Sequence, residues 1–332
     1  MNRRELLRLL SIAGTLVTLP QMGAREPGAV VRPAEAGDLD QYEQFNARLW
    51  QVFALSKSKR LVYPMVREQL AQLTTSLEQA NTQATHRRLC LMLGDLFQLA
   101  GEVFFDSNRY TDAAYCYTLA ASASKEADAH DLWACALTRH AYVGMYERRY
   151  DQAASILGAA SRVADAGDGH LSTRHWVSAV QAQAFAGVGD LDSCDRALDA
   201  ADQVRTLNGP VTNSGWLRFD GSRLAEERGT CYLRLGRADR AETALYEALN
   251  QSISLRRRGS ILADLAILGV QRRDLDQLVE YGDDAVDLAE QTRSAGYLGR
   301  KLQTLQVQLT PFIADSRVVQ LDRRIAQLAG TA

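Results

Sequence analysis

The pattern of apolar and polar positions is helical along most of this chain. From Asp40 onward, apolar residues recur every three or four positions, and strand-like alternation is almost absent. Only six residues are proline, with none between Pro64 and Pro210 and none between Pro210 and Pro311. Because proline is costly inside a helix and common in turns, these two runs indicate helix after helix joined by short turns. The sequence therefore predicts an all-α protein.

In addition to this helical periodicity, the sequence has a repeated pattern of large and small residues. The first copy has large and small residues, a polar turn, and then Tyr and Ala at fixed spacing: Phe97, Ala100, Gly101, Phe104, Tyr110, Ala113, Tyr117 and Ala120. We expect Gly101, Ala113 and Ala120 to lie where the two helices of a hairpin approach closely. The large residues would fill the adjoining holes.

The pattern recurs four more times. The positions equivalent to Tyr110 are Tyr150, Leu191, Ala238 and Leu275, so successive copies are offset by 40, 41, 47 and 37 residues. In each copy, polar or Gly residues come just before the second helix, which we expect to begin with an Asp or Thr cap. Five helix hairpins are predicted.

These residues resemble the tetratricopeptide (TPR) repeat. The TPR unit is about 34 residues long, so the larger offsets here imply longer helices or turns. The resemblance implies a right-handed superhelical solenoid of TPR-like helix hairpins over residues 39–330, with about 14 helices. The pairs at about 40–80 and 294–329 match the pattern poorly. We expect them to cap the open ends of the array.

A narrower resemblance concerns three stretches in the second half of the chain. Gly221–Ala241, Ser254–Gly259 and Val270–Gln277 resemble the carboxy-terminal TPR region of bacterial transcription regulators with an Xre-type helix-turn-helix. Residues 2–10 resemble the linker that follows that DNA-binding domain. The resemblance implies a sensor in transcription regulation. DNA would be bound only through a helix-turn-helix, which this chain does not contain.

Two predictions stay open for residues 1–38. Arg3 and Arg4 before the apolar run 9–19 resemble a twin-arginine export signal. The run is short for a membrane span, and the bulky Met22 does not fit the first position of a small-x-small cleavage site. The alternative is an amphipathic helix or linker, followed by a Pro- and Gly-containing connector. The first expectation is a cytoplasmic protein. The alternative is a protein exported or membrane-anchored through residues 1–20, acting as a TPR scaffold for the assembly of a complex.

Charge and cysteine usage narrow the classes of partner. Lys plus Arg is 38 and Asp plus Glu is 40, which gives a formal charge of −2 and no global attraction to nucleic acid or anionic lipid. The five cysteines form no C-x-x-C pair. They are typical of small buried side chains in a reducing compartment.

Motifs for catalysis and for cofactors are missing from the sequence. The five histidines include no H-E-x-x-H, and no cysteine lies at ligand spacing from one of them. No G-x-S-x-G or P-loop is present. We therefore expect no enzyme activity, no cofactor and no metal.

Binding in the concave groove is the functional prediction. The groove of a TPR array is formed by the first helix of each hairpin, and helical spacing assigns to it an aromatic and cationic lining. These positions are Arg139, Tyr142, Tyr146, Trp176, Gln183, Arg223, Glu226, Thr230 and Arg234. The lining suits a protein or a short peptide with an acidic or carboxylate group. A homodimer is also compatible, and so is the alternative that these are ordinary solvated groove residues.

An insertion lengthens the offset between the third and fourth copies. It spans Val204–Asp220 and contains Pro210, Trp216 and Phe219. The two aromatic residues cap a ligand in the groove, pack against a neighbour, or staple the loop onto the next helix. The sequence therefore predicts a TPR-type peptide- or protein-binding sensor or scaffold.

Overall fold

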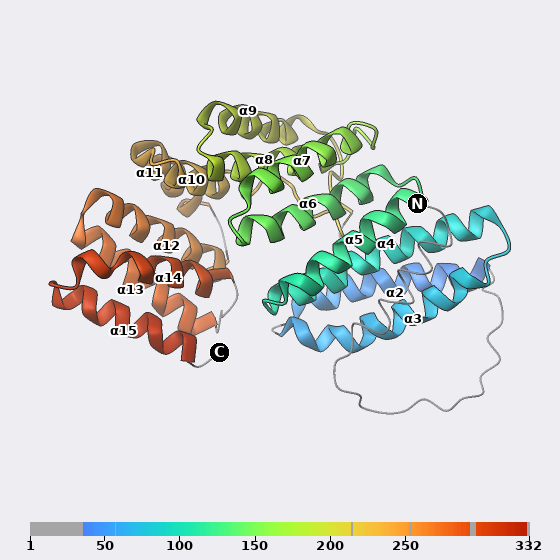
Figure 1. The fold of residues 1–332 in the computed structure, drawn as a ribbon, viewed down its shortest axis with the longest axis horizontal. Helices are drawn as coiled ribbons and strands as arrows, with labels where there is room; N and C mark the ends of the chain where they lie inside the picture. Colours follow the sequence, from blue (N-terminus) through green and yellow to red (C-terminus); the bar gives the residue numbers. More distant parts are fainter. Residues whose placement is uncertain (1–35, 57, 214, 252–253, 293–296, 331–332) are drawn as a thin grey trace. The chain divides into compact units, whose positions relative to one another are not determined.

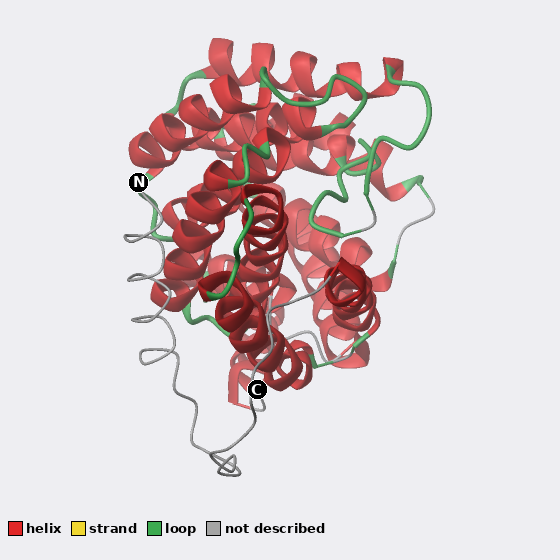
Figure 2. Ribbon diagram, turned by 90° about the vertical axis from the view of Figure 1, so that its right-hand side faces the viewer, coloured by secondary structure: helices red, strands yellow, loops and turns green. Residues whose placement is uncertain are grey.

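The fold is described by a computed structural model over residues 36–56, 58–213, 215–251, 254–292 and 297–330. The two predictions for residues 1–38 fall outside the described residues as far as residue 35, and residues 36–38 already belong to the first described helix. Within the described ranges the chain is all-α, with 14 α-helices and no strand (Figures 1 and 2). They are α2 (Ala36–Leu55), α3 (Tyr63–Glu78), α4 (Gln83–Asp106), α5 (Tyr110–Glu126), α6 (His130–Tyr146), α7 (Tyr150–Ala164), α8 (Thr173–Val188), α9 (Leu191–Asp202), α10 (Leu224–Arg234), α11 (Ala238–Leu249), α12 (Leu255–Arg272), α13 (Leu275–Thr292), α14 (Tyr297–Gln308) and α15 (Ser316–Gly330).

The chain divides into two compact units. The first extends to Val180 and also contains Gln203–Asp220, whereas the second contains Gln181–Asp202 and the residues from Gly221 onward. In the first unit α4 packs on α5, α6 packs on α7, and α4 also contacts α6. In the second unit α10 packs on α11, α12 packs on α13, and α12 also contacts α10 and α14. Within each unit, helices therefore pack on their neighbours along the chain, as stacked hairpins require.

The turn inside each predicted hairpin has the same backbone conformation. The residue two positions before the second helix has a left-handed φ of 57° to 88° in every copy: Asn108, Arg148, Gly189, Gly236 and Arg273. The N–H of the next residue then donates to the carbonyl five positions earlier, as Arg109 does to Phe104 at 2.9 Å. This is a Schellman ending, which closes the first helix and turns the chain toward the second. The structure confirms the predicted turn positions.

Two of the predicted caps of the second helices are present. Asp190 accepts a hydrogen bond from the backbone N–H of Ser193 at 2.9 Å, and Asp274 accepts one from Gln277 at 3.0 Å. In the other three hairpins the prediction is wrong, because an arginine occupies the cap position and makes no side-chain cap. Those helix starts depend on packing and on the repeated turn.

Close approach of helices at small residues is confirmed. A Cβ atom added to Gly101 would lie 2.3 Å from the ring of Tyr117, which is closer than real side chains come. Ala113 and Ala120 are fully buried. In the second unit, Gly229 faces Leu245 in the same way, at 2.6 Å. Both units thus use the predicted pairing of a small residue on one helix with a large residue on the other.

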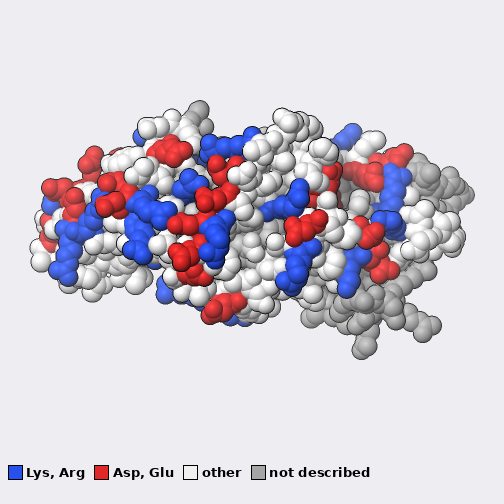
Figure 3. Space-filling view, turned by 90° about the horizontal axis from the view of Figure 1, so that it is seen from above, with Lys and Arg blue, Asp and Glu red and all other residues white. Residues whose placement is uncertain are grey.

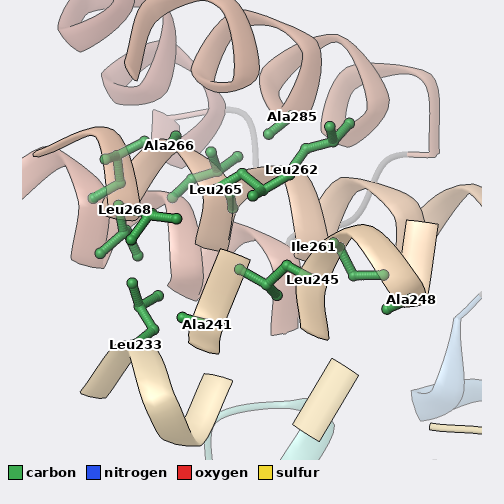
Figure 4. Close-up of a cluster of buried hydrophobic side chains, with 14 of the residues drawn as sticks. Leu233, Ala241, Leu245, Ala248, Ile261, Leu262, Leu265, Ala266, Leu268 and Ala285 are labelled. Atoms are coloured by element: carbon green, nitrogen blue, oxygen red, sulfur yellow. The ribbon is translucent and has the colours of Figure 1, made fainter. Parts of the chain in front are cut away.

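The second unit has a continuous aliphatic core. Its buried leucines, isoleucines and alanines come from α10, α11, α12 and α13 and interdigitate (Figure 4): Leu233, Ala241, Leu245, Ala248, Ile261, Leu262, Leu265, Ala266, Leu268 and Ala285. Burial of this much apolar surface is the main force that holds stacked helices together. Among the described residues, no helix is both long and apolar enough to cross a membrane.

Candidate functional site

The predicted groove residues are divided between the two units, and each set is described within its own unit. Arg139, Tyr142, Tyr146, Trp176, Trp216 and Phe219 belong to the first unit, whereas Gln183, Arg223, Glu226, Thr230 and Arg234 belong to the second. Most lie on the first helices α6, α8 and α10, as predicted.

Arg139 is the centre of the site in the first unit. Its side chain projects from α6 and is only 5% exposed. Its Nε donates to Oε1 of Glu102 at 3.1 Å, and its Nη1 donates to Oε1 of Gln98 at 2.6 Å. Its Nη2 donates to the main-chain carbonyl of Trp216 at 2.6 Å. The guanidinium therefore joins α4 and α6 to the insertion.

Aromatic rings surround this cation. The guanidinium carbon of Arg139 lies 4.8 Å from the ring centroid of Trp176 and 5.8 Å from that of Trp50 on α2. Arg218 of the insertion lies 5.1 Å from the Trp50 centroid, and its Nη2 lies 3.8 Å from Oε2 of Glu102. Two arginines are thus placed against tryptophan faces, where the ring quadrupole attracts a cation.

A hydrogen-bonded group of three side chains extends the site toward α2. Nε1 of Trp50 donates to Oδ1 of Asp95 at 2.6 Å, and the amide of Asn46 donates to Oδ2 of Asp95 at 3.2 Å. Burial raises the pKa of Asp95 to about 6, although both hydrogen bonds and the charge of Arg139 act in the opposite direction. These contacts fix the edge of the Trp50 ring and leave its face to Arg218.

The insertion is held on the first unit over Val211–Phe219. The hydroxyl of Ser172 donates to the carbonyl of Phe219 at 2.5 Å, and the N–H of Ser172 donates to the carbonyl of Val211 at 2.9 Å. Leu217 is fully buried, and Trp216 packs against the core of the first unit. The predicted capping of a ligand and the predicted stapling onto the next helix both stay predictions. Within the first unit, the contacts of the insertion include those to α6 and to Ser172, the residue before α8.

Tyr146 lies in a different aromatic group. Its ring makes an edge contact with Phe105, with centroids 4.9 Å apart, and a stacked contact with Tyr110 at 5.8 Å. Tyr142 is half-buried on α6. The structure thus brings Arg139, Trp176 and Trp216 together, whereas Tyr146 packs at the turn between α4 and α5.

In the second unit, Glu226 is part of a buried ion pair. Its carboxylate is 2% exposed and accepts from Nε of Arg257 at 3.0 Å and from Nη2 of Arg223 at 3.3 Å. Arg223 and Arg234 are exposed, and Gln183 is half-buried. Glu226 therefore ties α10 to α12 and is not a solvated groove residue.

A second buried acid continues this polar row. Asp264 on α12 is 2% exposed, accepts from the hydroxyl of Thr230 at 2.7 Å, and accepts from Nζ of Lys301 on α14 at 2.5 Å. The three first helices of the second unit are thus joined by polar side chains. On α10, directly after Glu226, burial raises the pKa of Glu227 to about 7. One carboxylate oxygen of Glu227 has no hydrogen-bond partner.

Several residues of these sites were missed from sequence, although a signal existed. Asp264 and the predicted Arg139 both lie 11 residues before the second helix of their hairpin, and Glu102 and Tyr142 both lie eight before it. Carrying the register of the second copy to the first and fifth copies therefore finds Glu102 and Asp264. Lys301 had no such signal, because its helix pair matches the repeat poorly.

The remaining polar chemistry concerns metal ligands and thiols in the described part of the chain. No group of three or more His, Cys, Asp or Glu side chains is placed to hold a metal there. All five cysteines are buried and none is in a disulfide, and burial raises the pKa of Cys135 to about 12, which suppresses its thiolate. On the face in Figure 3, basic and acidic side chains are interspersed and form no broad patch of one sign.

Comparison of the chain with protein-family models and with curated proteins found no match.

Proposed function

We propose that this chain is a TPR-type protein- or peptide-binding sensor or scaffold, related to the TPR regions of bacterial transcription regulators. The proposal includes a superhelical array of its hairpins, with the partner bound along the first helices. Three features support it: stacked hairpins within each unit, one turn geometry in all five copies, and polar and aromatic side chains along the first helices.

One observation carries the proposal. The first unit already holds a non-helical segment, residues 211–213 and 215–219, against α2, α4 and α6. Arg139 and Ser172 contact main-chain carbonyls of this segment, which any peptide possesses. Hydrogen bonds to the main chain of a bound peptide give affinity, and a pocket for one of its side chains gives specificity.

Selection from a peptide library tests this function. A displayed library of random peptides about ten residues long, spanning about 33 Å when extended, is panned against the purified chain. We expect enriched peptides whose binding is weakened about tenfold by Trp176→Ala or Arg234→Ala, which corresponds to the ~1.4 kcal/mol of a modest contact.

A matched control uses Arg196→Ala. Arg196 is exposed on the second helix α9, and its guanidinium donates to Ser193 on the same helix. Binding should be unchanged in this variant, with the same helical circular dichroism. The proposal fails if no peptide is enriched, or if the Arg196 variant loses binding while both first-helix variants keep it.

A further inference from the structure

We propose that Val211–Phe219, apart from residue 214, is an internal ligand of the first unit, and that the external partner of this face is a peptide with an aliphatic residue followed by a cationic one. This rests on the proposed peptide-binding function and names the chemistry of its ligand. The occupied face is the surface formed by Trp50, Gln98, Glu102, Arg139 and Trp176, here called the Arg139 face.

The main chain of the segment is bound as a foreign peptide would be. Carbonyls of Val211, Trp216 and Phe219 accept hydrogen bonds from Ser172 and Arg139. Such contacts do not depend on the identity of the bound side chains. They also satisfy the carbonyls of three half-buried residues. The segment closes one turn of its own, in which the N–H of Asn213 donates to the carbonyl of Leu217 at 3.1 Å.

The side chains of the segment define the preferred ligand. Leu217 is fully buried, so this position takes an aliphatic group. Arg218 lies over the rings of Trp50 and Phe53 and near Glu102, so the next position takes a cation. Because Glu102 already neutralises Arg139, this face favours a basic residue at that position. It does not favour the acidic group expected from the sequence.

The segment is built so that it can leave the face. It is not part of a helix, and it is bracketed by Gly209 and Gly221, which have φ of 86° and 79°. The residues just outside it, Pro210 and Asp220, are exposed. The Arg139 face itself is anchored without the segment, because Glu102 and Gln98 hold the guanidinium from α4.

A tether makes an internal ligand a strong competitor. A segment joined to its site by a short flexible linker has an effective concentration of about 1 mM, so a free peptide with a Kd of about 10 μM would bind the intact chain about 100-fold more weakly than an emptied one. An external partner must therefore bind tightly, or the segment must first be loosened.

The test supplies the segment as a separate peptide. The probe is a fluorescent peptide with the sequence of Gly209–Gly221, measured by anisotropy. The receptors are the intact chain, a chain with Val211–Phe219 replaced by Gly and Ser in equal number, and the full chain with Leu217→Ala. We expect both altered chains to bind the probe at least tenfold more tightly than the intact chain.

Control peptides and receptors separate specific recognition from nonspecific binding. Peptides in which Leu217 is replaced by Asp, or Arg218 by Glu, should lose binding at least tenfold. Arg139→Met in the replaced chain should do the same. The inference is overturned if the altered chains keep their helical circular dichroism and bind the probe no better than the intact chain, or bind all peptides equally. It is also overturned if neither altered chain folds, because the segment is then a structural part.

The outcome also separates this inference from the function on which it rests. If library-selected peptides bind along the first helices and the Gly209–Gly221 peptide does not, the internal ligand is refuted and the binding function stands. If neither kind of peptide binds any of the chains, both proposals fall.

Discussion

Arg139→Met gives the sharpest test of how the first unit is assembled. The substitution keeps the length and apolar stem of the side chain and removes its charge. It breaks hydrogen bonds of 3.1, 2.6 and 2.6 Å to Glu102, Gln98 and Trp216. Breaking a buried ion pair on one side costs about 3–5 kcal/mol, because the remaining charge is left uncompensated.

The structure places the expected loss at the lower end of this range. Glu102 is 25% exposed, and it retains the Tyr117 hydroxyl at 3.1 Å and Arg218 at 3.8 Å. We therefore expect the free energy of unfolding to fall by about 3 kcal/mol. Arg139→Lys keeps the charge but not the planar fork, and it should lose about 1–2 kcal/mol.

Urea unfolding, followed by tryptophan fluorescence and far-ultraviolet circular dichroism, measures both losses. Fluorescence reports directly on the site, because Trp50 and Trp176 contact Arg139. Arg196→Met on the exposed face of α9 serves as the control and should change stability by less than about 0.5 kcal/mol. A loss below about 1 kcal/mol for Arg139→Met, with the same urea dependence, would refute the placement of this arginine at the centre of the unit.

Four further substitutions test other parts of the structure. Gly101→Val should destabilise by about 1–3 kcal/mol through overpacking against the ring of Tyr117, and a silent result in a thermal melt would contradict the helix register. Arg148→Gly should stabilise by about 0.5–1 kcal/mol, since Arg148 has a φ of 58° that glycine adopts without strain; a lower melting temperature would count against the turn. Glu227→Gln should stabilise by about 1–3 kcal/mol at pH 8 and much less at pH 4, because burial raises the pKa of Glu227 to about 7 and its contribution to stability is lost as the pH rises through that value; equal effects in urea unfolding at the two pH values would refute this. Lys301→Ala should destabilise by about 3–5 kcal/mol, because it leaves the buried carboxylate of Asp264 without its ion-pair partner. Chemical denaturation should show that most of this loss is recovered in the double variant with Asp264→Leu.

The hairpins and their turns could be predicted because the information is local. Periodic apolar positions, the pairing of Gly101 with Tyr117, and polar turns before Tyr110 and Tyr150 all lie within one helix pair. A helix that ends in a left-handed residue needs only a glycine, an asparagine or an exposed side chain there. Packing between neighbouring pairs then follows from the repeat.

The sites could be predicted only in part, because contacts between distant segments decide them. Spacing along α6 singles out Arg139, but its partner Trp216 lies 77 residues further along the chain. Likewise, the pattern puts Glu226 on the first-helix row without revealing Arg257, which buries it as an ion pair. Helical spacing identifies the face of a residue and not what covers that face.

The direct measurement of the central claim is a crystal structure of the Gly–Ser-replaced chain with the Gly209–Gly221 peptide. The account predicts the peptide on the Arg139 face, with the carbonyl of its tryptophan within hydrogen-bonding distance of Nη2 of Arg139, as in the intact chain at 2.6 Å. A folded complex with the peptide bound elsewhere, or with the Arg139 face empty, would contradict it.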